Sequence, residues 1–240
     1  MPAIEAITFD FWDTIMVAQV SDAQRTRVAA CAAVLEGAGH DVALSDVDAA
    51  VATAFRAYRE AWEGNRQFGA SQVATICLDT LGLPISLHDQ LEEAIVADGA
   101  ERELETAPNI GSALAALNHA GLRIGIICDV GITGSLYLRR ALERAGLLGE
   151  FAHWSFSDEV GHYKPSPFMF DHAMAGLGVS DPSRMCHIGD LRRTDVAGAK
   201  AAGWLAIRYA GLVDDPSDGP EGDIVVRDHA DLPGVLARGT

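Results

Sequence analysis

The chain has 240 residues, 49% of them hydrophobic and 22% charged, and its formal net charge is −16. These values are typical of a soluble globular protein that is either one large domain or a core with a smaller insertion. The negative charge argues against nucleic acids and acidic membrane surfaces as partners, because binding to them relies on lysine and arginine. No apolar stretch approaches the ~20 residues that a membrane span needs. Four cysteines without CxxC spacing predict reduced thiols and a cytoplasmic protein rather than a disulfide framework or a zinc site.

Residues 4–9 form an apolar run that ends abruptly at Asp10. The run predicts a short buried strand with a carboxylate at its carboxyl end, as in open parallel sheets that bind ligands outside their strand ends. Residues 16–104 contain no strand signal and predict four helices. Ser45, with Asp48 three residues later, resembles a capping box ahead of apolar residues at helical spacing. We therefore expect a helical subdomain inserted just after the first strand.

Beyond residue 104, expected strands and helices alternate. The expected strands cover residues 122–127, 152–156, 185–188, 205–208 and 224–226. The expected helices cover residues 108–120, 133–145 and 196–202, and one more begins at Ser166, with Pro167 in its first turn. This alternation predicts an α/β fold, a Rossmann-like parallel sheet with helices on both faces.

Polar residues follow several of these strands. Cys128 and Asp129 follow residues 122–127, and Asp190 follows Ile188-Gly189 after the strand at 185–188. Asp195 comes five residues after Asp190, and the segment 157–165 contributes Lys164.

Together with Phe9-Asp10-Phe11-Trp12-Asp13-Thr14, these stretches resemble, in the same order, the four motifs of the haloacid dehalogenase (HAD) superfamily. The resemblance extends over essentially the whole chain. It implies a HAD-like α/β core formed by residues 1–15 and 105–240, with residues 16–104 as an all-α helical cap.

The resemblance also implies roles for individual residues. Asp10 is expected to be the nucleophile, and Lys164 to supply a fixed positive charge. Mg²⁺ is expected to bind Asp10, Asp190 and the backbone carbonyl of Trp12, with Asp195 binding it directly or through water. The chemistry fits, since carboxylates ~4 Å apart repel by roughly 4 kcal/mol at a dielectric near 20. All-oxygen ligands suit Mg²⁺.

Cys128 and Asp129 are expected to bind substrate, because they stand where the family has Ser or Thr and commonly Asn. Two interpretations of Cys128 stay open: a phosphate contact, or a small hydrophobe at a buried strand end. A thiol donates weakly, so the backbone N–H groups of Asp129 and Val130 are alternative phosphate donors. Three histidines lack a partner at ligand spacing and are interpreted as structural: His162, His172 and His187.

Trp12 is the main departure from the family pattern. HAD phosphatases have an aspartate two residues after the nucleophile, and this acid/base typically contributes ~10² to 10⁴-fold to the rate. An indole cannot replace it. Asp13 is expected to be a loop hydrogen-bonder instead.

The leading prediction is a Mg²⁺-dependent phosphatase for a small phosphorylated metabolite, acting through an aspartyl-phosphate on Asp10. One alternative is a 2-haloacid dehalogenase, which also lacks the second aspartate but does not need the metal-binding acids. Another is a HAD-fold binding or regulatory protein with reduced or lost turnover. Phosphonoacetaldehyde hydrolase is nearly excluded, because it needs a cap lysine and the chain has only Lys164 and Lys200. The expected partner is a small anionic molecule, and the sequence does not indicate an oligomeric state.

Overall fold

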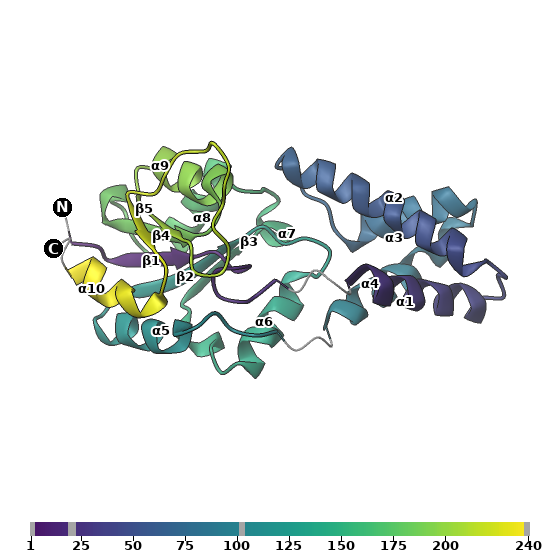
Figure 1. Ribbon diagram of the computed structural model, residues 1–240, viewed down its shortest axis with the longest axis horizontal. Helices are drawn as coiled ribbons and strands as arrows, with labels where there is room; N and C mark the ends of the chain where they lie inside the picture. The colour runs from purple at the N-terminus through teal and green to yellow at the C-terminus, as the bar shows by residue number, and fades with distance from the viewer. Residues whose placement is uncertain (1–2, 19–22, 101–103, 238–240) are drawn as a thin grey trace. The chain divides into compact units, whose positions relative to one another are not determined.

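The computed structural model describes residues 3–18, 23–100 and 104–237, and a six-stranded sheet organises the larger part of them (Figure 1). The strands, in sheet order, are β3 (His153–Phe156), β2 (Arg123–Cys128), β1 (Ala6–Phe9), β4 (Met185–Gly189), β5 (Leu205–Tyr209) and β6 (Ile224–Val226). Every neighbouring pair is parallel. The predicted α/β fold is confirmed.

Helices cover both faces of the sheet, as Figure 1 shows. On one face lie α8 (Pro167–Gly176) and α9 (Ala197–Ala201), and on the other lie α5 (Ile110–His119) and α10 (Leu232–Ala237). Two-sided coverage explains why all four residues of β1 are buried and why the strand is almost entirely apolar. The short helix α7 (Ser157–Val160) follows β3 directly.

The strand order reverses beside β1. The chain runs from β1 to β2 and β3 on one side of the sheet, and then crosses to β4, β5 and β6 on the other. A crevice for ligands forms at such a reversal, outside the carboxyl ends of the strands. In this chain the reversal lies between β1 and β4, whose carboxyl ends lead into Asp10 and Asp190.

One local prediction was wrong. Ser45 does not begin a helix with a capping box: α2 spans Leu44–Glu63, and its N-cap is Ala43, which makes no side-chain cap hydrogen bond. Ser45 therefore lies inside the first turn, where its hydroxyl cannot serve as the cap. The helix expected at 196–202 is confirmed as α9 (Ala197–Ala201), and a π-helical turn, η4 (Arg192–Val196), directly precedes it. Single π-turns occur frequently at functional sites.

The helical part of the chain contains α1 (Ala23–Gly37), α2, α3 (Ala70–Leu81) and α4 (His88–Ala100). These helices share a buried apolar core of their own, to which α2 contributes Val47 and Val51 and α3 contributes Val73 and Leu78. Within the described ranges, no helix combines the length and the apolar character needed to cross a membrane.

The chain divides into two compact units. One comprises residues 1–18, 104–129 and 142–240, and the other comprises residues 19–103 and 130–141. The sequence pattern predicts residues 130–141 as part of the α/β core. They group with the helices instead, because Gln67 Nε2 donates to the Val130 carbonyl and the Tyr58 ring packs against Gly131. The helix α6 (Ser135–Arg144) carries the chain back into the α/β unit.

The helices α8 and α9 pack so closely that a larger residue at their contact should destabilise the protein. A Cβ on Gly198 in α9 would overlap the ring of Phe170, which is fully buried between His187 and Trp204. Gly198→Ala should therefore lower the free energy of unfolding of the α/β unit by about 1–3 kcal/mol, measured by urea denaturation.

The matched control is Gly234→Ala in α10, where the added Cβ would meet no atom within 4 Å. Both substitutions improve helix propensity, so Gly234→Ala should be neutral or stabilising by up to about 1 kcal/mol. Equal effects of the two variants would contradict the packing argument.

Candidate active site

Three buried carboxylates converge at the carboxyl ends of β1 and β4. Asp10 follows β1, and its backbone N–H donates to the Ile188 carbonyl of β4 at 2.7 Å. Asp190 follows β4, and Asp195 lies in η4. The three side chains offer oxygen ligands that all lie within 4.8 Å of one another. The structure thus brings together three of the four residues expected to bind metal.

Lys164 holds this carboxylate cluster together. Its Nζ lies 2.5 Å from Asp10 Oδ1 and 2.6 Å from Asp195 Oδ1, and it also donates to the Ile127 carbonyl at 3.1 Å. An ammonium group has three hydrogens, so these contacts use all of its donors. The Lys164 side chain is 2% exposed, so its charge interacts with the carboxylates and not with solvent.

Asp195 is fixed by further donors. Its Oδ1 also accepts a hydrogen bond from His187 Nε2 at 3.1 Å, and its Oδ2 accepts one from the Leu191 backbone N–H at 2.9 Å. A Cβ on Gly189 would overlap the Asp195 side chain, so glycine is needed there for space. Burial would raise the pKa of Asp195, but Lys164 and His187 hold it well below its usual range.

Asp10 and Asp190 are not surrounded by as many hydrogen-bond donors as Asp195, and their pKa values are raised. Burial, together with the neighbouring Asp195 and Asp10, raises the pKa of Asp190 to about 9. Burial also raises the pKa of Asp10 to about 7, although Lys164 acts in the opposite direction. Burial alone would lower the pKa of Lys164, but the surrounding carboxylates raise it well above its usual range. When all three carboxyls are ionised, the single ammonium leaves an excess of buried negative charge, which a divalent cation with oxygen ligands would neutralise.

Cys128 and Asp129 lie at the end of β2, beside this cluster. Burial raises the pKa of the Cys128 thiol well above its usual value, so the group is a neutral, weak donor. Asp129 Oδ1 accepts the Lys164 backbone N–H at 2.8 Å, and burial raises the pKa of this carboxyl to about 6. Asp129 therefore orients Lys164, while the substrate-binding roles of both residues stay predictions.

In the loop that follows Asp10, no second carboxylate points toward the carboxylate cluster. Trp12 is partly buried and makes an edge contact with Phe11, with ring centroids 4.9 Å apart. Asp13 has a positive φ of 52°, and its Oδ1 accepts the Ala18 backbone N–H at 3.0 Å. Asp13 is thus a loop hydrogen-bonder, as expected from the sequence. The Trp12 carbonyl as a metal ligand stays a prediction.

The comparisons with known proteins agree with this geometry. A family model for haloacid dehalogenase-like hydrolases matches residues 4–203. The chain belongs to this family.

Named relatives of this hydrolase include phosphatases. It is 27% identical over 210 residues to the glyceraldehyde 3-phosphate phosphatase of Methanopyrus kandleri, covering 85% of this chain and 83% of the relative. It is 32% identical over 131 residues to the phosphoserine phosphatase of Thermus thermophilus, covering 50% and 51%. Its fold is similar to that of a 2-haloacid dehalogenase from Pseudomonas syringae pv. Tomato DC3000, with a TM-score of 0.72 and 23% identity over 99% and 100% of the two chains.

Sequence reasoning missed two residues of the hydrolase's site, Thr8 and His187. His187 had been interpreted as structural, yet it contacts Asp195. Its Nδ1 lies 2.8 Å from Thr8 Oγ1, because β1 and β4 pair with Thr8 opposite His187. The available signal was the presence of one polar residue in each of two otherwise apolar buried strands, two residues before Asp10 and two before Gly189.

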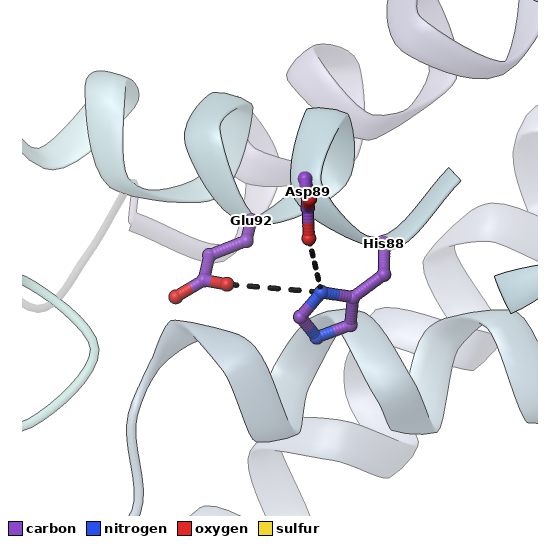
Figure 2. Close-up of side chains that lie close together, drawn as sticks. All are labelled: His88, Asp89 and Glu92. Carbon is purple, nitrogen blue, oxygen red and sulfur yellow. Dashed lines mark hydrogen bonds and ion pairs between the residues drawn. The ribbon is translucent and has the colours of Figure 1, made fainter. Parts of the chain in front are cut away.

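A second group of possible metal-binding side chains among the described residues lies at the start of α4 in the helical unit. Figure 2 shows His88 facing Asp89 and Glu92, with Nδ1 at 3.0 Å and 3.8 Å from their carboxylate oxygens. The other ring nitrogen donates to the Ser71 carbonyl at 3.1 Å. This nitrogen also lies 3.1 Å from the Ser71 hydroxyl, which can donate or accept, and the hydrogen bond with Asp89 raises the pKa of His88. We interpret this group as an ion pair.

This ion pair predicts a pH-dependent contribution to stability. Because the folded-state pKa of His88 is raised, its contribution is complete below the unfolded pKa of about 6.5 and is lost as pH rises through the folded value. His88→Ala should therefore lower the melting temperature more at acidic than at alkaline pH. A double variant, Asp89→Asn with Glu92→Gln, should reproduce this pattern. A deficit independent of pH would show that His88 acts through packing alone.

Proposed function

We propose that this hydrolase is a Mg²⁺-dependent phosphatase that acts on a small phosphorylated metabolite through an aspartyl-phosphate on Asp10. The proposal rests mainly on one observation: Asp10 shares Lys164 with Asp195, inside a cluster of three buried carboxylates. A nucleophilic carboxylate that attacks a phosphate needs nearby positive charge, and Lys164 alone does not balance the cluster. We assign residues 16–104 the role of the family's helical cap.

Asp10 performs the first step in this proposal. Lys164 fixes Asp10 Oδ1, and a carboxylate oxygen of Asp10 attacks phosphorus, so that an oxygen–phosphorus bond forms while the bond to the leaving alcohol breaks. The alkoxide takes its proton from water, because Trp12 has no acidic group to supply one. Water then hydrolyses the aspartyl-phosphate, which releases inorganic phosphate and regenerates Asp10. Bound Mg²⁺, held by Asp10, Asp190 and Asp195, would neutralise the charge that phosphate and carboxylates share.

The relatives indicate which substrates to test first. Two of them are named for glyceraldehyde 3-phosphate and phosphoserine, both small phosphate monoesters. The expected result is phosphate release from one or more such esters that requires Mg²⁺ and is abolished by EDTA. Release of chloride from 2-chloropropionate in the presence of EDTA would instead support the dehalogenase alternative, which the missing acid at Trp12 favours. Substrate binding without release of either product would support a protein without turnover.

Asp190 provides the test of the metal. Asp190→Asn keeps the shape of the side chain but removes one anionic ligand, so it should abolish Mg²⁺-dependent hydrolysis and the Mg²⁺-induced rise in melting temperature. The control is Asp171→Asn, the same change on the exposed face of α8, which should leave both unchanged. Full activity of Asp190→Asn, or of EDTA-treated wild type, would reject the metal assignment.

Trp12 provides the test of the missing acid/base. Without a proton donor, p-nitrophenyl phosphate, with its good leaving group, should react much faster than alkyl phosphates. Trp12→Asp should raise turnover of alkyl phosphates by up to ~10²-fold, the low end of acid/base assistance. Trp12→Asn has nearly the same shape without the acid and should give no gain. A folded Trp12→Asp variant no faster than Trp12→Asn would refute this account.

A further inference from the structure

A continuous chain of buried hydrogen bonds runs from the interior of the sheet to Asp10. Thr8 Oγ1 lies 2.8 Å from His187 Nδ1, and His187 Nε2 lies 3.1 Å from Asp195 Oδ1. Asp195 Oδ1 also contacts Lys164 Nζ, which contacts Asp10 Oδ1. All five residues are at most 7% exposed, so these contacts are largely shielded from water. We call these five residues the Thr8–Asp10 relay.

The partners of His187 determine which of its nitrogens carries the hydrogen. A carboxylate such as Asp195 only accepts hydrogen bonds, so Nε2 must be the donor. In the neutral ring Nδ1 is then an acceptor, and the hydroxyl of Thr8 must donate to it. The distances agree, since Thr8 Oγ1 is closer to Nδ1 than to its other acceptor, the Cys186 carbonyl at 3.4 Å.

The imidazole also has little freedom to turn away. Phe170 packs against it edge-on, with ring centroids 5.5 Å apart, and His187 is 1% exposed. The backbone of His187 is fixed in β4, directly opposite Thr8. Both the position and the tautomer of the ring are therefore set before any ligand binds.

We propose that His187 is a positioning residue of the active site: it acts through Asp195 to hold Lys164 and Asp10 in the arrangement that binds the divalent cation and attacks phosphate. The inference rests on the proposed function. His187 does not touch the reacting atoms. Without its N–H, Asp195 Oδ1 retains only Lys164 and Oδ2 retains the Leu191 backbone N–H, so that two donors instead of three hold the carboxylate in place.

The experiment compares two substitutions of His187 in the full chain. His187→Gln places an amide N–H close to the position of Nε2, whereas His187→Leu fills space without a donor. Loss of such an outer hydrogen bond typically weakens metal affinity by about 10–100-fold. Calorimetric titration with Mg²⁺ should therefore show that loss for His187→Leu, with His187→Gln within about threefold of wild type. With Mg²⁺ saturating, kcat should fall for His187→Leu while KM changes little.

A second pair of variants keeps the test decisive if His187→Leu does not fold. Thr8→Val removes the hydroxyl at nearly constant shape, and Thr8→Ser keeps it. Thr8→Val should weaken Mg²⁺ binding and change the tautomer-sensitive ¹⁵N shifts of the His187 ring, whereas Thr8→Ser should preserve both. Wild-type shifts that identify Nδ1 as the protonated nitrogen would overturn the proposal.

The outcomes separate this inference from the proposed function. If wild type neither binds Mg²⁺ nor releases phosphate, the proposed function fails, and this inference fails with it. If wild type does both and folded His187→Leu binds Mg²⁺ equally well, only the positioning role is rejected. Equal impairment of His187→Leu and His187→Gln would also reject it, because that result indicates a packing role.

Discussion

The site depends on the ion pairs that the ammonium group of Lys164 makes with two buried carboxylates. This ammonium group lies between Asp10 and Asp195, and its three donors are fully used. Removing one partner of a buried ion pair typically costs 3–5 kcal/mol, because the remaining charge stays buried without compensation. Here two carboxylates would lose their partner at once. The position of Lys164 is in turn fixed by Asp129 at the end of β2, so three neighbouring strands contribute to one charge arrangement.

The two acids around Lys164 differ in a way that suits different tasks. Asp195 accepts three N–H donors and has a lowered pKa, so it remains ionised and rigid. Asp10 has a raised pKa because burial outweighs its single ammonium partner. A carboxyl whose charge is poorly compensated is stabilised more by a nearby cation than one that is already well compensated. The same sheet edge therefore holds two carboxyls whose pKa values are shifted in opposite directions.

The sequence predicted those parts of the site that lie at strand ends. Asp10, Cys128 and Asp190 each follow an apolar run. The pattern of apolar and polar residues along the sequence identifies such strand ends without a structure. Thr8 and His187 could not be paired in this way, because the register between β1 and β4 is a tertiary property. Residues 130–141 were expected in the α/β core but cluster with the helical unit, for a similar reason. Their helical pattern is clear, but the contacts of Tyr58 and Gln67 that group them with the helical unit are not local in sequence.

The position of β1 in the centre of the sheet also affects the order in which the chain assembles. Its neighbours β2 and β4 begin only at residues 123 and 185, so β1 is synthesised long before either strand that covers its edges. Until then its backbone groups and apolar side chains have no permanent partners, and an unpaired apolar strand is prone to aggregation. The long helical segment between β1 and β2 has its own core and can fold in the meantime. A nascent chain that ends before β4 would thus carry an incomplete sheet, in which β1 still lacks one of its two neighbouring strands.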